Sequence, residues 1–230
     1  MAFIKLIEDN DINDTNPLLL KYPCSISILG VRGSGKTNTL LNILKFYSDP
    51  IEEIYIYCST IEQDGYINLL NEDKRIINVD TEPPDEETLN TIMEIEKNKM
   101  IIFDDLFDVV NNKKYEYLNK VYTYGRHKNL SICELSQSIF KVSILKRINS
   151  DYIFLHRIND INNVKIFLKK FYDDGERLLK CYLYAIKKNN GHGFLLIDNK
   201  TNNDILRFRD NSLDHSFYNY LYNNNNYLII

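Results

Sequence analysis

Residues 30–37 read Gly-Val-Arg-Gly-Ser-Gly-Lys-Thr, the complete GxxxxGK[ST] pattern of a phosphate-binding loop. Glycines let backbone N–H groups approach a triphosphate more closely than most side chains would permit. Lys36 adds a point charge at the β/γ end of the triphosphate, and the Thr37 hydroxyl is a ligand for Mg²⁺. We expect this nucleoside triphosphate site to comprise Gly30, Val31, Arg32, Gly33, Ser34, Gly35, Lys36, Thr37 and Asn38.

The segments on either side of the loop favour a bound nucleotide over a simple glycine-rich turn. Residues 24–29 (CSISIL) are β-prone and mostly apolar, which predicts a strand. In residues 38–47 (NTLLNILKFY) leucines recur at helical spacing, and the helix would begin near Lys36. Its unpaired N–H groups and its dipole would then point at the phosphates.

A second pattern ends an apolar strand, Met100 to Phe103, with the two carboxylates of Asp104 and Asp105. This has the form of a Walker B element. We expect the strand to run parallel to the first one, with the two strand ends side by side. Asp104 would then hold Mg²⁺ directly or through water, and Asp105 would orient and partly deprotonate an attacking water. Alternatively, the two residues only begin a turn or cap a helix.

The adjacent pair of carboxylates favours a hydrolytic ring motor among the classes of phosphate-loop protein. GTPases and nucleotide kinases commonly lack the second carboxylate. A GTPase would also carry an NKxD motif that recognises the base, and the nearest string, residues 199–202 (NKTN), lacks the Asp. The sequence has no clear arginine-rich lid of a small-molecule kinase.

A third pattern, residues 125–129 (GRHKN), precedes a predicted strand that leads into Gln137. Because this strand would neighbour the Walker B strand, Gln137 would contact the γ-phosphate or the attacking water and report hydrolysis. Arg126 would lie at the opposite end of the strand, too far from its own nucleotide but within reach of a neighbouring subunit's. An arginine inserted across an interface is worth about 10³ to 10⁵ in rate. The alternative for Arg126 and His127 is ordinary surface or capping contacts.

The rest of the chain alternates apolar runs with helical patterns, which predicts an α/β fold with a mostly parallel sheet flanked by helices on both faces. A terminal hairpin of residues 194–198 and 205–208 would complete it. Further strands are predicted at 51–58, 75–79, 99–103, 130–135 and 152–155, and helices at 85–98, 115–124, 142–148, 161–172 and 176–187.

Length and composition suit one α/β domain, since the chain has 230 residues of which 44% are hydrophobic. We expect an N-terminal extension (1–21), a P-loop core (22–190), the hairpin (191–212) packed on the core, and an Asn- and Tyr-rich tail (213–230). No signal peptide or membrane-spanning segment is recognisable, so a soluble, cytosolic protein is expected. The four cysteines form no metal pattern and are expected to be reduced and buried: Cys24, Cys58, Cys133 and Cys181.

Charge is unevenly distributed along the chain. Residues 1–110 hold 9 Lys and Arg against 21 Asp and Glu, whereas residues 111–230 hold 19 against 11. The second half would attract a polyanion such as DNA, unless these charges are simply solvated surface.

Five segments occur together in this order: GVRGSGKT, MIIFDDL, YGRHKNLS, SQS and LKRINSDYIF. Together they resemble the poxvirus-type genome-packaging ATPases of large DNA viruses and virophages, a branch of the FtsK–HerA superfamily. The resemblance covers roughly residues 22–200. It implies a RecA-like P-loop core that binds ATP and Mg²⁺, assembles into a homo-oligomeric ring, and pumps double-stranded DNA into a preformed capsid.

The resemblance also implies roles for individual residues. Lys36 and Thr37 would bind nucleotide and Mg²⁺, and Asp104 would complete the metal site. The catalytic residues would be Asp105 as the carboxylate that activates water, Gln137 as the sensor, and Arg126 as the arginine acting in trans, with Arg147 as the second candidate. The chain departs from many superfamily members in carrying Asp-Asp instead of Asp-Glu.

The same resemblance implies partners and a location. Besides DNA, the partners would be capsid or portal-like vertex proteins, and the protein would work in viral factories of the host cytoplasm and also in the virion. DNA phosphates would be contacted by lysines, each of which is alternatively a solvated surface residue: Lys113, Lys114, Lys141, Lys146, Lys169 and Lys170.

Two other functions stay open. One is a P-loop phosphotransferase, a kinase with a small acceptor. The other is a nucleotide-gated capsid interaction protein with little turnover. Asp105 argues against both.

Overall fold

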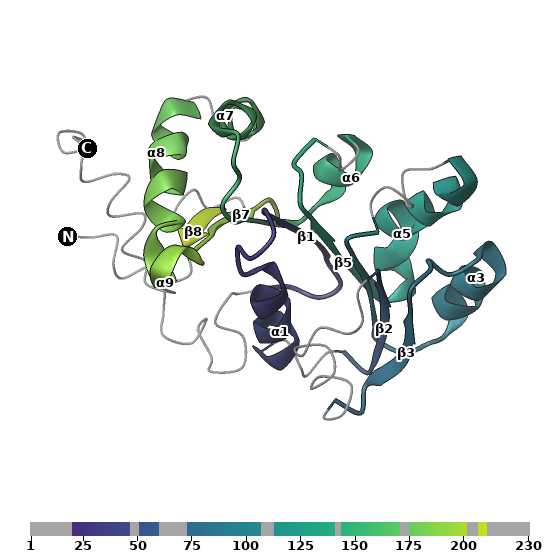
Figure 1. Ribbon diagram of the computed structural model, residues 1–230. Coiled ribbons are helices and arrows are strands. Elements are labelled where there is room, and N and C mark those ends of the chain that lie inside the picture. Colours follow the sequence, from purple (N-terminus) through teal and green to yellow (C-terminus); the bar gives the residue numbers. More distant parts are fainter. Residues whose placement is uncertain are drawn as a thin grey trace.

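The computed structural model describes residues 20–46, 51–59, 73–106, 113–140, 144–170, 175–201 and 207–210. These residues build one sheet of eight strands in the order β3-β2-β4-β5-β1-β6-β7-β8 (Figure 1). The strands are β1 (Ser25–Leu29), β2 (Glu53–Cys58), β3 (Ile76–Asp80), β4 (Lys99–Asp104), β5 (Leu130–Ser136), β6 (Tyr152–Leu155), β7 (Leu195–Asp198) and β8 (Phe208–Asp210).

The sheet is mostly parallel, as predicted. β1 pairs in parallel with β5 and β6, β4 with β2 and β5, and β2 with β3. The last two pairings are antiparallel: β7 is antiparallel to β6, and β8 is antiparallel to β7, so among the described strands β7 alone runs against the others. This pairing confirms the predicted hairpin, although its second strand is Phe208–Asp210 where residues 205–208 were predicted. Every residue of β1, β2, β4, β5 and β6 is buried, as expected for parallel strands that are covered on both faces.

Helices cover both faces of the sheet. The α-helices are α1 (Lys36–Phe46), α3 (Glu86–Glu94), α5 (Asn119–Tyr124), α6 (Ile144–Asn149), α7 (Ile161–Leu168), α8 (Gly175–Ala185) and α9 (Lys188–Gly191), and two 3₁₀ segments are η1 (Lys113–Leu118) and η2 (Gly125–Lys128). In Figure 1, α1 lies on one side of the sheet, and α3, α5, α6 and α7 lie on the other.

Side-chain alternation in β2 explains how the two layers form. Ile54 and Ile56 point to the face where Leu40 and Ile43 of α1 pack. Tyr55 and Tyr57 point to the opposite face and pack in a cluster with Leu89 and Ile92 of α3. A period of two along the strand therefore joins two separate cores through one sheet.

Helix ends differ from the predicted ends by a few residues. The helix predicted at 85–98 ends at Glu94, because Ile95 takes an extended conformation. The Asn98 carbonyl accepts from the backbone N–H of Glu52 at 2.8 Å, which aligns the start of β4 with β2. The beginning of this helix, α3, is as expected, since the Asp85 carboxylate caps it by accepting from Thr88 N at 2.7 Å.

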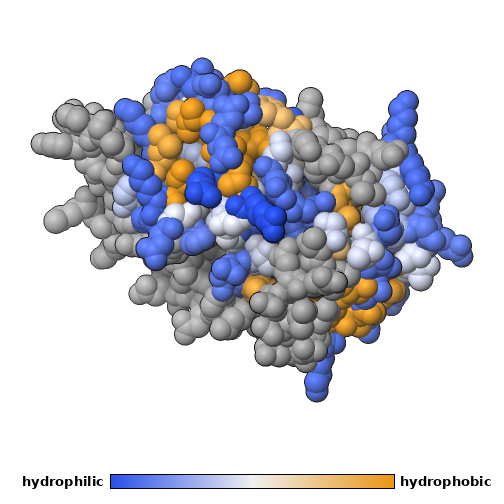
Figure 2. All heavy atoms as spheres, viewed as in Figure 1, coloured by the Kyte–Doolittle hydropathy of each residue, from blue (hydrophilic) through white to orange (hydrophobic). Residues whose placement is uncertain are grey.

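The four cysteines are buried, as expected, and form no disulfide with one another in the described residues. Nearly all of the predicted N-terminal extension and the whole tail (213–230) lie outside the described residues. Across the described segments, each helix is too short or too polar to cross a membrane. Figure 2 shows apolar patches among hydrophilic atoms in the region of α7 and α8. Ile161 and Ile166 of α7 are exposed apolar side chains.

Candidate functional site

The loop between β1 and α1 has a backbone that requires its glycines. Gly33 and Gly35 take φ values of +71° and +101°, a region that residues with a side chain rarely adopt. A Cβ atom at Gly30 would lie 2.5 Å from Ser34 Oγ and 2.6 Å from His156 Cβ. Close packing therefore requires glycine at Gly30, and the positive φ favours glycine at Gly33 and Gly35.

Two backbone bonds attach the loop to neighbouring strands. Gly30 N donates to Ser136 O and Val31 N donates to Arg157 O, both at 3.0 Å. The loop is thus fixed between the ends of β5 and β6. The first turn of α1, which carries Thr37 and Asn38, follows directly from it.

Lys36 lies at the centre of the loop and is buried. Its Nζ donates to the carbonyl oxygens of Gly30 at 2.9 Å and Val31 at 3.4 Å. Burial lowers the pKa of Lys36, and the negative charges of Asp105 and Asp104 oppose this shift. The lysine and the two predicted carboxylates therefore converge.

The carboxylates reach the loop by a different route from the one predicted. Asp104 is the last residue of β4 and is buried, but β4 does not lie beside β1, because β5 runs between them. The expectation of two adjacent strand ends was therefore wrong. Asp105 lies beyond the strand, where its N–H donates to Leu135 O of β5 at 3.3 Å, so the turn leans over the intervening strand toward the loop. Its φ is +53°, in the left-handed region.

The intervening strand β5 carries Gln137 immediately after its carboxyl end. The Nε2 atom of this exposed side chain donates to Asp105 Oδ2 at 2.7 Å. Gln137 thus lies next to the carboxylates, on the strand between them and the phosphate loop. Gln137 therefore lies at the carboxyl end of the strand, as the sequence predicted.

The two candidate arginines lie elsewhere. Arg126 is in η2, before the amino end of β5, and its Nη2 forms an ion pair with Asp151 while half of the side chain stays exposed. Arg147 of α6 is buried, with its guanidinium 5.5 Å from the ring centroid of Phe140. Burial lowers the pKa of Arg147, whose Nε and Nη1 have no hydrogen-bond partner among the described residues. Neither arginine joins the phosphate loop of its own chain.

Sequence reasoning missed two histidines that contact the loop. His156 follows β6, is fully buried, and bonds through Nε2 to Thr39 Oγ1 of α1 at 3.0 Å. The connection before β7 brings His192 to the loop, so that a Cβ on Gly35 would meet its Cβ and its carbonyl oxygen at 3.4 Å. A histidine after an apolar strand has no distinctive spacing, so only the structure identifies these two.

Burial lowers the pKa of His156 from 6.5 to about 4, so the ring is neutral in the folded protein. Below about pH 6.5 the unfolded chain binds a proton at His156, whereas the folded protein does not. The folded state therefore has its full stability above that pH and loses stability as the pH falls toward 4. Lowering the pH from about 7 to about 5 is expected to remove about 2 kcal/mol from the free energy of unfolding. Urea denaturation at both pH values measures this loss, and a His156→Gln variant is expected not to show it. An equal pH dependence in both proteins would contradict the assignment.

The candidate DNA-contacting lysines fall into three groups. Lys146 is buried and its Nζ lies 3.2 Å from Glu134 Oε1, so the proposal that it contacts DNA was wrong. Glu134 is a charged residue in the buried strand β5 and needs a partner of opposite charge, and the Lys146 ammonium is that partner. Lys141 lies outside the described residues. The exposed members are Lys113, Lys114, Lys169 and Lys170.

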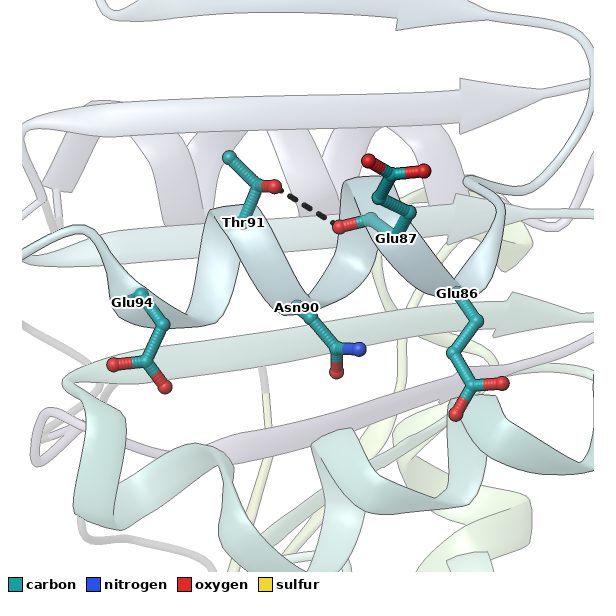
Figure 3. A pocket seen from close by; sticks show the side chains of 5 residues that line it. All are labelled: Glu86, Glu87, Asn90, Thr91 and Glu94. Carbon is teal, nitrogen blue, oxygen red and sulfur yellow. Dashed lines mark hydrogen bonds between the residues drawn. The ribbon is translucent and has the colours of Figure 1, made fainter.

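A separate hollow lies along α3 and is lined by Glu86, Glu87, Asn90, Thr91 and Glu94 (Figure 3). Two of its three carboxylates form ion pairs with residues further along the chain: Glu86 pairs with Lys120 of α5 at 2.5 Å, and Glu94 pairs with Lys128 of η2 at 2.8 Å. These pairs connect α3 to its neighbours, and the remaining acidic character disfavours a triphosphate. The phosphate loop is therefore the better candidate for a nucleotide.

Comparisons with known proteins agree with this arrangement. The sequence profile of the family described as Poxvirus A32 protein matches residues 14–200. The DNA packaging protein OPG160 of Variola virus is 30% identical over 161 residues, 64% of this chain and 58% of that protein. Its counterpart in Vaccinia virus (strain Copenhagen) has the same identity and coverage. The chain thus aligns with less than two thirds of the length of these relatives.

The fold also matches solved structures. The genome packaging NTPase B204 from Sulfolobus turreted icosahedral virus 2, in complex with AMP, superposes with a TM-score of 0.59 at 13% identity, covering 83% of this chain and 98% of that one. Its complex with ATP-gammaS gives 0.58 at 14%, covering 85% and 97%. At such identities the likeness concerns the fold. The family match, however, extends over most of the chain, which therefore belongs to the Poxvirus A32 protein family, as the resemblance predicted.

Proposed function

We propose that this chain is an ATP-hydrolysing motor subunit that translocates double-stranded viral DNA into a preformed capsid. The observation that carries the proposal is the convergence of Lys36, Asp104 and Asp105 at one edge of the sheet, with Gln137 bonded to Asp105. The name of the OPG160 relatives, DNA packaging protein, supports the choice of DNA as the cargo.

The residues present fit a magnesium triphosphate. The loop leaves no room for a Cβ at Gly30, and its Ser34 hydroxyl is buried without a hydrogen-bond partner among the described residues. Backbone N–H groups of the loop and the Lys36 ammonium would bind the phosphates. Thr37 and Asp104 would hold Mg²⁺, which when bound neutralises charge on the phosphate oxygens.

Asp105 would serve as the base that orients the attacking water and accepts its proton. Gln137 donates to one oxygen of this carboxylate, which leaves the other oxygen for the water. Loss of the γ-phosphate would first alter the contact between Asp105 and Gln137, because Gln137 follows the strand that lies between the carboxylates and the loop. Gln137 would therefore act as the sensor of hydrolysis.

Arg126 would complete the site of a neighbouring subunit in a ring. Its position before the amino end of β5 is opposite to its own phosphate loop, and half of its side chain is exposed. Arg147 is the second candidate for this role, but it is buried and would first have to become accessible. Exposure thus favours Arg126.

DNA would be gripped through its phosphates with little sequence preference, which gives binding a steep dependence on salt. Lys113 and Lys114 follow the Walker B strand in the chain and are exposed, so they are the first candidates for this contact. Capsid or portal-like vertex proteins would receive the DNA. The protein would act in viral factories of the host cytoplasm.

The decisive measurement is the ATPase rate with and without long duplex DNA, together with the mass of the assembled particle. We expect DNA to stimulate turnover by a multimer, and Lys36→Ala to abolish it. Turnover by a monomer that ignores DNA would contradict the motor. Phosphate transfer to a small acceptor would favour the kinase, and ATP binding with scarcely any turnover would favour the interaction protein.

A further inference from the structure

Arg126 is held by a carboxylate that is itself fixed in the sheet. We propose that Asp151 is a positioning residue that aims the Arg126 guanidinium at the nucleotide of the neighbouring subunit. This inference rests on the proposed role of Arg126 in trans. The opposite possibility, that Asp151 withholds the arginine from the neighbour, makes the opposite prediction below.

The two oxygens of Asp151 have separate partners. Oδ2 accepts from the backbone N–H of Ser25 at 2.8 Å and lies 3.1 Å from the Ser25 hydroxyl, which shares its proton with the carbonyl of Asn149. Oδ1 accepts from Arg126 Nη2. The side chain is 5% exposed, against 50% for Arg126. One oxygen therefore fixes the carboxylate to β1, and the other holds the arginine at the surface.

The backbone of Asp151 is fixed as well. Its N–H donates to Ser25 O at 2.8 Å, and its carbonyl accepts from Asn199 N at 2.7 Å. Asp151 is thus bonded both to β1 and to the turn that follows β7. Because these bonds fix the Asp151 carboxylate in place, the position of the carboxylate determines where the Arg126 guanidinium lies.

This anchoring has a consequence for catalysis. Arginine is a long side chain that loses much rotamer freedom when it is placed at a reacting group. Fixing Nη2 in advance removes part of that cost, and the guanidinium has five N–H donors, so others remain for a phosphate. The same carboxylate keeps the positive charge paired until the neighbour arrives.

Asp151→Asn tests the proposal with little change in shape. The amide oxygen can accept from Ser25 or from Arg126, but the amide nitrogen cannot accept from either. We expect rings of this variant to lose about 10- to 100-fold in kcat, because a misplaced group of this kind costs up to about 10²-fold. ATP binding is expected to be unchanged. Increased turnover would overturn the proposal in favour of the withholding contact.

Mixed rings show whether the effect is exerted on the neighbour. Asp151→Asn subunits mixed with Lys36→Ala subunits are expected to recover activity, since the Lys36→Ala neighbour supplies an intact Arg126 and Asp151. Asp151→Asn mixed with Arg126→Ala is expected not to recover, because both lack the same contribution. Recovery in the second mixture, or its absence in the first, would overturn the proposal.

Controls separate this outcome from other failures. If Arg126→Ala and Lys36→Ala subunits fail to complement each other, the trans role of Arg126 is wrong. If only the mixture of Asp151→Asn with Lys36→Ala fails, the positioning role of Asp151 is wrong and the role of Arg126 is unaffected. Asp73→Asn breaks another Asp–Arg pair, with Arg75 at 2.5 Å, and is expected to leave kcat unchanged. Should Asp151→Asn not fold, Ser25→Ala removes one bond to the carboxylate, and it is expected to complement in the same way with a smaller loss. The opposite pattern of complementation would again overturn the proposal.

Discussion

Rings built only from Arg126→Ala subunits are expected to lose about 10³- to 10⁵-fold in ATP turnover, the range found for arginines that act across an interface. The guanidinium would stabilise charge on the transferring phosphoryl group, and truncation leaves that charge without a partner. Steady-state ATPase assays on the assembled particle measure the loss. Binding of ATP is expected to stay intact, because Arg126 lies at the other edge of the sheet from its own phosphate loop.

A mixing experiment distinguishes action in trans from action in cis. Arg126→Ala subunits combined with Lys36→Ala subunits are expected to recover part of the activity through hybrid interfaces. Arg126→Lys is a matched control that keeps the charge but loses the planar fork, and it is expected to recover only a small part of the rate. Absence of recovery in the mixed rings would remove the assignment in trans.

Asp105→Asn is expected to lower kcat by about 10²- to 10⁴-fold while sparing ATP binding, since the amide cannot accept a proton from water. The amide oxygen can still accept from Gln137, so the 2.7 Å contact need not be lost. Single-turnover hydrolysis and equilibrium nucleotide binding, measured on the same preparation, separate the two effects.

The neighbouring carboxylate provides the control for this prediction. Asp104→Asn is expected to raise the Mg²⁺ concentration that is needed for activity, because Asp104 is assigned to the metal. If Asp105→Asn hydrolyses ATP at the normal rate, its role as the base is wrong.

Local patterns were sufficient to predict the strand, loop and helix around Lys36. Glycine spacing, apolar runs and helical periodicity are properties of neighbouring residues, and the structure has these elements within a few residues of the predicted ends. The poxvirus family, predicted from five segments in order, is confirmed by the family match. The assigned roles of Asp105, Gln137 and Arg126 stay predictions.

Strand order was predicted only in part. The strand that leads into Gln137 was expected beside the Walker B strand, and β5 does pair with β4, but the expectation that β4 also lies beside β1 was wrong. β5 comes between β1 and β4 because of how crossovers pack against the sheet, and no residue within either strand encodes that neighbour. Lys146 shows the same limit for charge. Its ion pair with Glu134 joins a helix to a strand, and the only signal was an acidic residue inside an otherwise uncharged strand.

If Arg126 acts in trans as proposed, its placement at the end of the strands opposite the phosphate loop determines which symmetry an assembly can have. An arginine from one edge that meets a nucleotide at the other edge joins two unlike surfaces, and such a heterologous contact repeats head to tail. Closure of that repeat gives cyclic symmetry, in which all subunits face the same way around the axis. The direction of the parallel strands would then set the polarity of the assembly. That polarity would in turn set the direction in which DNA moves through the ring.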